Sequence, residues 1–191
     1  MRHRPLRLAA ALAAALVWSV MTAGIASANA NLLRDGGFEW PALNGAFSHS
    51  YTAGDHIGAW RVRSGGVSVS TAFPGIEAPP AGTQVMNLRA LPIPGPGDGR
   101  ICQTVSGLVP GAMYKVRFQA ASAIQDSTIA VTLGPVPVAT VHLSGSVPAR
   151  FTVFERHVTA PASSAPLCLG GHPIQGGAVP LVDAVRLELV S

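Results

Sequence analysis

MYKVRFQA, at positions 113–120, alternates apolar and polar side chains from its second residue to its last. Successive side chains of a β-strand point to opposite faces, so the apolar residues share one face and the polar residues share the other. This pattern is typical of an antiparallel strand with one face in the core and one in water. A Pro-Gly pair at 110–111 directly before it indicates a turn. The stretch therefore predicts a half-buried strand.

Short runs of similar character recur along the chain, separated by turn residues. The 21 Gly and 16 Pro are spread between runs rich in Val, Thr, Leu and aromatic residues, and no long stretch after residue 30 shows a helical apolar period. Further strands are expected at residues 59–63, 67–70, 84–89, 100–105, 128–133, 137–143, 151–159, 167–169 and 182–190. About ten strands without helices predict an all-β fold, a jelly-roll β-sandwich of two antiparallel sheets.

The first thirty residues have the three parts of a secretory signal peptide. Three arginines lie among the first seven residues, residues 8–25 are apolar and Ala-rich, and Ala-Asn-Ala at 28–30 is a small-x-small cleavage site. A retained membrane anchor is the alternative, but no basic cluster follows the apolar stretch. We therefore expect cleavage of residues 1–30, which leaves a single secreted domain over residues 31–191 with no membrane partner.

The charge of the mature chain is close to neutral. The whole chain has 13 Lys+Arg and 9 Asp+Glu, and three of the arginines lie in the expected signal peptide. Lys115 is the single lysine, and no cluster of basic residues follows the leader. Nucleic acids and anionic membrane surfaces are therefore not expected as partners.

Two cysteines remain, Cys102 and Cys168. An even number of cysteines in an exported protein favours a disulfide, and both residues fall in or beside expected strands. A bond across so long a loop would stabilise the fold by about 4 kcal/mol in the chain-entropy model. Two buried free thiols are the alternative. A metal site is less favoured, because neither cysteine has a second ligand at C-x-x-C or C-x-x-H spacing.

Two phrases stand at the ends of the mature chain. NLLRDGGFE, at positions 31–39, predicts a short strand that breaks at two glycines before a buried aromatic residue and a carboxylate. LVDAVRLEL, at positions 181–189, predicts a closing strand with one acidic residue at its entry. Between them follow, in order, GAWRV at 58–62, GTQVMNL at 82–88, ICQTV at 101–105 and PGAMYKVRF at 110–118.

This order of motifs resembles the cell-wall "domain of unknown function 642" family and its bacterial relatives, the choice-of-anchor C domains. It is also similar to family-4-type carbohydrate-binding modules. The resemblance covers nearly all of the mature chain, and it depends on the order and spacing of motifs that are individually weak. It implies an extracellular, non-catalytic, galactose-binding-like sandwich that is associated with polysaccharide walls.

The resemblance also implies a structural Ca²⁺ that ties the first strand to the last. Calcium takes six to eight oxygen ligands from carboxylates and carbonyls. Gly37 would offer a carbonyl, Glu39 a carboxylate, and Asp183 a side-chain and a backbone oxygen. The alternative is that Glu39 and Asp183 are ordinary solvated or hydrogen-bonded acids at strand ends.

A carbohydrate site needs an aromatic platform and polar groups. Phe38, Trp60, Tyr114 and Phe118 fit core positions of the expected strands. The better candidates for a platform lie in loop-like segments, with polar residues nearby that would bond sugar hydroxyls. These ligand-binding candidates are Trp40, Phe47, Tyr51 and Phe73, together with His49, Asp55 and His56.

The sequence contains no nucleophile elbow, zinc-protease helix or phosphate-binding loop, so we do not expect an enzyme. We expect a secreted non-catalytic module that binds a polysaccharide or a cell-wall component. The alternative is a structural or protein-interaction module of the cell surface without a sugar site. Exposed and clustered platform candidates would favour the first interpretation, and buried ones the second.

Overall fold

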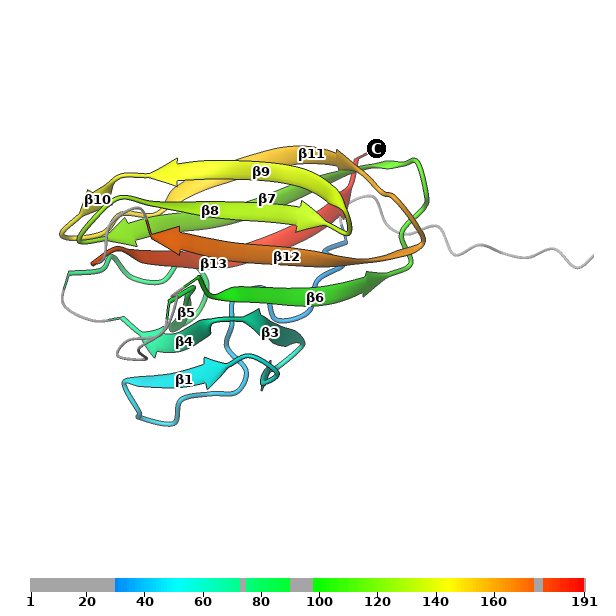
Figure 1. Cartoon of the computed structure of the whole chain (residues 1–191). Coiled ribbons are helices and arrows are strands. Elements are labelled where there is room, and N and C mark those ends of the chain that lie inside the picture. The colour runs from blue at the N-terminus through cyan, green and yellow to red at the C-terminus, as the bar shows by residue number, and fades with distance from the viewer. Residues whose placement is uncertain (1–29, 73–74, 90–97, 174–176, 191) are drawn as a thin grey trace, which may run out of the picture.

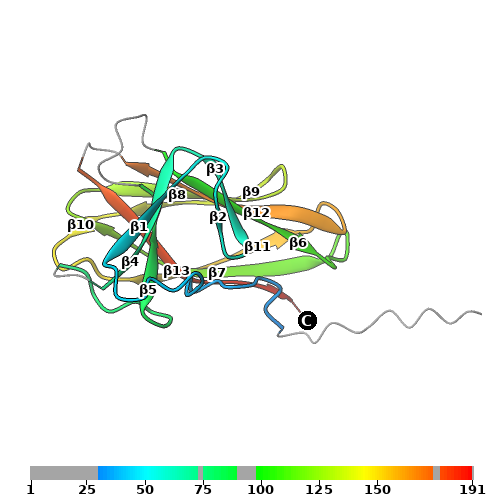
Figure 2. The ribbon, with the colours of Figure 1, turned by 90° about the horizontal axis from the view of Figure 1, so that it is seen from below.

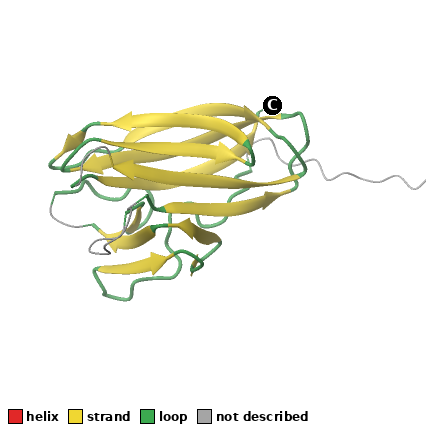
Figure 3. Ribbon diagram, in the orientation of Figure 1, coloured by secondary structure: helices red, strands yellow, loops and turns green. Residues whose placement is uncertain are grey.

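The computed structural model describes residues 30–72, 75–89, 98–173 and 177–190. The predicted leader and the platform candidate Phe73 therefore lie outside the described residues, apart from Ala30. Strands and loops make up the whole described part (Figure 3). None of its segments is a helix that could cross a membrane.

Two sheets face each other (Figures 1 and 2). The seven-stranded sheet runs β1 (Ser48–Thr52), β4 (Gly66–Thr71), β5 (Gln84–Asn87), β13 (Val179–Leu189), β7 (Met113–Ala123) and β10 (Gly145–Ser146), with β11 (Thr152–Thr159) also paired to β7. The six-stranded sheet runs β2 (His56–Ile57), β3 (Trp60–Ser64), β6 (Arg100–Ser106), β12 (Ser164–Pro173), β8 (Ser127–Leu133) and β9 (Val136–Leu143). Only the short β10–β7 pairing is parallel among these strands. The predicted all-β sandwich is confirmed.

The ten expected strands that begin at residue 59 or later all exist, with ends shifted by a few residues, and the structure adds β1, β2 and β10. The expected short strand in residues 31–39 is wrong. This segment forms no ladder and instead follows the last strand: the Leu32 amide donates to the Leu187 carbonyl at 2.9 Å, and the Val185 amide donates to the Gly36 carbonyl at 2.8 Å. The two adjacent glycines lie at the second of these contacts, where the segment leaves the last strand.

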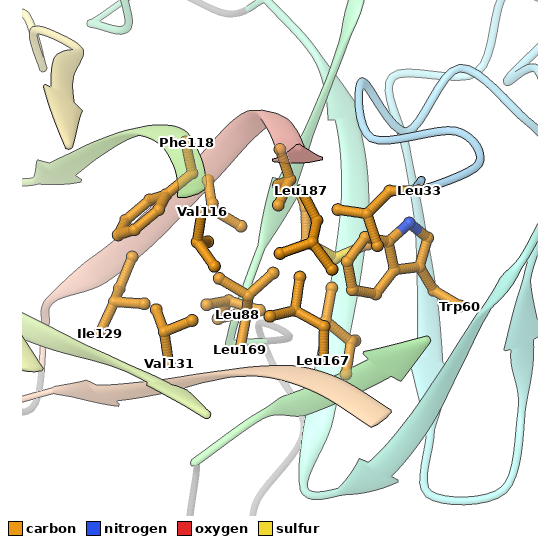
Figure 4. Packing of buried hydrophobic residues seen from close by; sticks show 14 of the residues in the cluster. Leu33, Trp60, Leu88, Val116, Phe118, Ile129, Val131, Leu167, Leu169 and Leu187 are labelled. Carbon is orange, nitrogen blue, oxygen red and sulfur yellow. The ribbon is translucent and has the colours of Figure 1, made fainter. Parts of the chain in front are cut away.

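The main core lies between the sheets, where apolar side chains from both meet (Figure 4). Phe38, Trp60, Tyr114 and Phe118 are each at most 1% exposed, as the alternation of their strands predicts. Phe38 reaches the core from the N-terminal segment and packs against Trp60 with ring centroids 5.5 Å apart. Burial of each such ring contributes about 2–3 kcal/mol, so the segment is held by its side chains as well as by its backbone.

A second apolar cluster lies on the outer face of the seven-stranded sheet. Residues of β5, β7 and β13 that alternate with core residues form its base, and two loops fold over it. Ile76 and Ala149 belong to these loops and form an isolated β-bridge with each other. The members of the cluster are Ile76, Val85, Ala121, Ala123, Ala149, Val179 and Leu181, with Phe151 packed against them. The loops therefore cover part of this face and leave a groove beside the covered part.

The predicted disulfide is confirmed. Cys102 and Cys168 are directly opposite each other in β6 and β12, with Cα atoms 4.1 Å apart. Their neighbours Ile101 and Leu169 point into the core, so the bond lies on the outer face of the six-stranded sheet.

Candidate functional site

A groove of about 450 Å³ opens on the outer face of the seven-stranded sheet. It lies beside the loops that cover the second apolar cluster. Its described lining contains small polar and apolar side chains and no charged one. The lining residues are Phe47, Ser48, Ser68, Ser70, Gly75, Asn87, Ala123, Ile124, Val147 and Val179.

The polar floor of the groove comes from alternation along β4. Val67 and Val69 point into the main core, so Ser68 and Ser70 point to the groove. Ser70 is directly opposite Ser48 of β1, and Ser68 is directly opposite Asn87 of β5. Directly opposite residues share a face, so three neighbouring strands bring their small polar side chains together.

Ser70 is the most unusual member of the floor. Its residue is 4% exposed, and its hydroxyl oxygen is buried without a hydrogen-bond partner among the described residues. A buried polar group without a partner costs about 1–3 kcal/mol, so native proteins keep few of them. Ser70 also lines the groove, so this unpartnered hydroxyl lies directly at the groove floor.

The rim of the groove is apolar. Phe47, Ile124 and Val147 are 55%, 59% and 71% exposed, although large apolar side chains are usually buried. Ile124 has φ 73°, a left-handed conformation that is rare for a β-branched residue. Such strain is found where a fold must place a side chain at a particular point, here beside the groove.

Only one of the described platform candidates lines the groove. Phe47 is on its rim, but Trp40 is 68% exposed at a different place, beside Gly58. The expectation that Tyr51 lies in a loop is wrong, because it belongs to β1. It is only 9% exposed, and its ring contacts His49 with centroids 4.7 Å apart. The three described candidates, Trp40, Phe47 and Tyr51, therefore do not form one exposed platform.

The polar candidates lie outside the groove lining. His49, Asp55 and His56 are all exposed, around the turn between β1 and β2. The Asp55 carboxylate accepts hydrogen bonds from the Thr52 amide at 2.7 Å and from the Thr52 hydroxyl at 3.1 Å. These bonds, and to a lesser extent the two histidines, lower the pKa of Asp55. Asp55 therefore stabilises the turn, while His56 faces a second, polar cavity.

Asp183 is fully buried at a bulge where the register between β13 and β7 shifts. Its Oδ2 accepts the Ala81 amide at 2.8 Å, and its Oδ1 accepts the Ala184 amide at 2.6 Å. Burial raises the pKa of Asp183 to about 7, with smaller contributions from the charges of Glu39 and Asp35, although the two amides oppose the change.

Glu39 bonds to the loop at 81–84, whose Ala81 amide bonds to Asp183. Its Oε1 accepts the amides of Thr83 at 3.0 Å and Gln84 at 2.8 Å, and its Oε2 accepts the Thr83 hydroxyl at 3.0 Å. Gly82 has φ 72°, and a side chain there would overlap the Glu39 carboxyl group. Glu39 and Asp183 thus hold the 81–84 loop against the N-terminal segment and β13, an arrangement that we call the acidic clasp.

The geometry of the acidic clasp neither confirms nor contradicts the predicted calcium site. Gly37 lies beside Asp183, since a Cβ on Gly37 would stand 3.8 Å from Oδ1 of that residue. The donor types suit calcium, but backbone amides already engage both carboxylates. No three His, Cys, Asp or Glu side chains converge as metal ligands anywhere in the described ranges. A structural calcium ion at Gly37, Glu39 and Asp183 therefore stays a prediction.

Similarity to known proteins is found in structure. No family model matches the chain, and no curated protein matches it in sequence. TmCBM61 in complex with β-1,4-galactotriose superposes with a TM-score of 0.52 at 19% identity, covering 84% of this chain and 99% of that one. The enzymatically active domain of tailspike protein 4 from bacteriophage CBA120 gives a TM-score of 0.51 at 15% identity, with coverages of 84% and 21%.

A third structure, the CBM22-1 xylan-binding domain of Xyn10C from Paenibacillus barcinonensis, has a TM-score of 0.46 at 16% identity, covering 87% of this chain and 98% of that domain. The chain spans about a fifth of the tailspike chain. At these identities, the two matches with TM-scores above 0.5 show that the chain shares its fold with TmCBM61 and with part of the tailspike domain, and they show the fold alone. The resemblance to the "domain of unknown function 642" family and the choice-of-anchor C domains stays a prediction.

Most of the residues that line the groove were not predicted from the sequence. VSVS at 67–70 was expected as a strand, and its alternation of valine with serine already indicates a polar row opposite the core row. The partners of that row could not be found in the same way. Ile124 and Val147 come from separate loops, and their meeting with Phe47 depends on how those loops fold over the sheet.

Proposed function

We propose that this protein is a secreted, non-catalytic module that binds a neutral saccharide in the groove of the seven-stranded sheet. One observation carries the proposal: the buried, unpartnered Ser70 hydroxyl lies on a polar floor beneath an exposed apolar rim. The signal-peptide pattern and the disulfide support secretion, because disulfides persist in oxidising compartments.

The chemistry of the groove suits a sugar. Serine hydroxyls both donate and accept, so Ser48, Ser68 and Ser70 match the hydroxyls of a pyranose. The ring of Phe47 offers an apolar surface for the C–H face of the same sugar. A lining without charged side chains favours a neutral ligand. The volume of about 450 Å³ lies within the range of about 300–1,000 Å³ for small-ligand sites.

The fold neighbour in complex with β-1,4-galactotriose suggests the first ligand to test. A neutral β-galactan oligosaccharide has the size and the hydroxyl content that the groove requires. Hydrolysis of a glycan by two side chains would need a pair of facing carboxylates, and the described groove lining contains none. This supports binding without catalysis.

The test is isothermal titration of the secreted protein with β-1,4-galactotriose, followed by an array of neutral glycans. Phe47→Ala is expected to weaken binding about tenfold, and Ser70→Ala about fivefold. Met113→Ala removes a 50% exposed side chain outside the groove lining and is the matched control.

A stability measurement separates a binding role of Ser70 from a structural one. Ser70→Ala removes a buried hydroxyl that has no partner, so the free energy of unfolding is expected to rise by about 1 kcal/mol. A fall in both stability and affinity would show that the hydroxyl supports the fold. If a folded wild-type protein binds no neutral glycan, the surface-interaction alternative replaces this proposal.

A further inference from the structure

A second cavity, of about 430 Å³, lies on the opposite side of the molecule. Residues of the N-terminal segment, of strand β2 and the turn that follows it, and of strand β6 line it. Its lining is mainly polar and includes a cation, unlike that of the groove. The residues that line it are Leu32, Arg34, His56, Gly58, Ala59, Gln103, Thr104 and Ser106.

Gln103 holds the backbone of Arg34 at the wall of this cavity. The side chain of Gln103 is 5% exposed and forms two bonds to Arg34: Nε2 donates to the Arg34 carbonyl, and Oε1 accepts the Arg34 amide, both at 2.8 Å. A buried amide that is satisfied in this way holds the backbone in one position. The guanidinium forms no ion pair within the described part of the chain, so its five donors remain available.

Trp40 is a direct neighbour of Gly58, one of the residues that line this cavity. Its side chain is 68% exposed, and its Cδ1 lies 3.5 Å from the point where a Cβ on Gly58 would stand. Gly58 has φ 55° and lies so close to the Trp40 carbonyl that any side chain there would clash. The glycine therefore lets the backbone at Trp40 pack directly against the turn that forms part of the cavity wall. An exposed indole beside a polar cavity is a surface on which a sugar ring can stack.

Arg61 extends the positive charge beyond the cavity. It is directly opposite His56 on one side and Cys102 on the other, so all three lie on the outer face of the six-stranded sheet. Arg63 follows at the β3 bulge. Neither arginine forms an ion pair among the described residues.

Two carboxylates lie near this surface, and backbone amides engage both. Asp35, close to Gly58, accepts the Glu39 amide at 2.8 Å and the Trp40 amide at 3.3 Å. Asp55 accepts the Thr52 amide and hydroxyl. These carboxylates therefore stabilise turns, and the three arginines keep their donors for a ligand.

We propose that Arg34, Trp40 and Arg61 form a second site, which binds a saccharide that carries negative charges. Arg34 would bind an acidic group at the cavity wall, Trp40 would stack on the ring, and Arg61 would bind the acidic group of a following unit. The planar guanidinium matches the two oxygens of a carboxylate and also fits a sulfate ester. The site is independent of the neutral groove on the other sheet.

The experiment titrates the secreted protein with three tetrasaccharides of one chain length. They are a uronic-acid tetramer, its fully methyl-esterified form, which lacks the charge, and a sulfated tetramer. The uronate is expected to bind in about 20 mM salt and to weaken severalfold in about 200 mM salt, because exposed charges are screened. The methyl ester is expected to bind at least about tenfold more weakly, the loss expected when charge-assisted bonds are removed.

Variants locate the site. Arg34→Gln and Arg61→Gln are each expected to weaken uronate binding about tenfold, and Trp40→Ala by a similar factor. Arg156→Gln makes the same charge change on β11 of the other sheet and should leave the affinity unchanged. Arg34→Lys keeps the charge but not the planar fork, so intermediate binding is expected. Near-ultraviolet circular dichroism and melting confirm that each variant is folded.

Each possible result of these experiments either supports or overturns the proposal. Equal affinity for the uronate and its methyl ester, or an equal loss with Arg156→Gln, overturns the proposal. So does absence of binding to both charged tetramers by the folded protein. Binding of the sulfated tetramer alone assigns the site to sulfate esters. Ser70→Ala should reduce neutral-glycan binding and leave uronate binding intact, so failure at one site is distinguishable from failure at the other.

Discussion

The two outer faces of the sandwich differ in how their charges are paired. On the seven-stranded sheet, Lys115 and Arg186 both contact Glu188, at 3.4 and 3.8 Å, and Arg117 contacts Glu155 at 3.4 Å. On the six-stranded sheet, Arg61 and Arg63 have no such partner in the described ranges, and the Arg100 guanidinium donates to the Thr132 hydroxyl. The six-stranded sheet thus leaves Arg61 and Arg63 unpaired among the described residues, although His172 of the same sheet contacts Asp98 at 2.7 Å.

The faces also differ in how they are covered. Loops that contain Ile76 and Ala149 fold over the seven-stranded sheet and bury a second apolar cluster, which leaves a groove without charge. The six-stranded face carries the buried disulfide, and residues of the N-terminal segment line its cavity. The described lining of the groove thus has no charged side chain, whereas that of the cavity includes Arg34.

The largest effect should come from the covalent link on the six-stranded face. Replacing both Cys102 and Cys168 by serine is expected to lower the free energy of unfolding by about 4 kcal/mol, since the bond closes a long loop in the unfolded chain. Urea unfolding measures the loss. Alanine at both Ser106 and Ser164, an exposed pair of the same two strands, is the control. An unchanged midpoint in the double serine variant would mean that this face does not depend on its bond.

The acidic clasp holds the N-terminal segment to the seven-stranded sheet, and Asp183 should make the stability of the fold depend on pH. The folded pKa of about 7 lies above the unfolded value of 3.8. Between these values the folded state keeps a proton that the unfolded state has lost, so stability falls as pH rises from about 4 to about 7. The loss is on the order of 3 kcal/mol, at about 1.4 kcal/mol per pKa unit.

Urea unfolding of wild type and Asp183→Asn at several pH values checks this expectation. The variant cannot titrate at this position, so its stability should change less between pH 4 and pH 7, whatever its starting value. Asp55→Asn is the matched control, because that residue is exposed and its pKa is lowered. Parallel pH profiles for wild type and Asp183→Asn would contradict a titrating Asp183.

Calcium binding at the acidic clasp would reverse that dependence. A ligand that binds only the folded state adds about 2.7 kcal/mol at a hundredfold excess over its dissociation constant. Melting in calcium should then exceed melting in chelator at pH 7.5, and by less at pH 5.5, where a proton competes for Asp183. Asp183→Ala should remove the difference. Identical melting of the wild type in calcium and chelator would end the calcium prediction.

The smallest effect concerns the paired charges. Glu155→Gln frees Arg117 on the seven-stranded face, and stability should fall by only about 0.2–1 kcal/mol, because both side chains are nearly half exposed. The more informative measurement is uronate affinity, which should stay unchanged. A clear gain in affinity would show that any unpaired arginine on this protein attracts acidic saccharides, and the special role of the six-stranded face would be lost.

Much of the fold was predictable because its signals are local. The alternation in MYKVRFQA gave the direction of each side chain in β7, and Tyr114 and Phe118 are buried as expected. The polar strand β1 escaped prediction because its sequence, SHSYT, lacks an apolar alternation and it pairs only with β4, at the edge of the sheet. The N-terminal segment was misread because its glycines break a regular ladder.

The sequence by itself determined the class of fold, the core aromatic residues and the partner of each cysteine, because strand periodicity and a count of two are properties of the chain alone. Only the tertiary structure decided which exposed residues meet. Phe47, Ser70 and Val147 come from three separate segments, and a strand register and two folded loops bring them to one groove. Arg34 lines its cavity because the N-terminal segment is bonded to Gln103 and to Val185 of the last strand, contacts between residues far apart in the sequence.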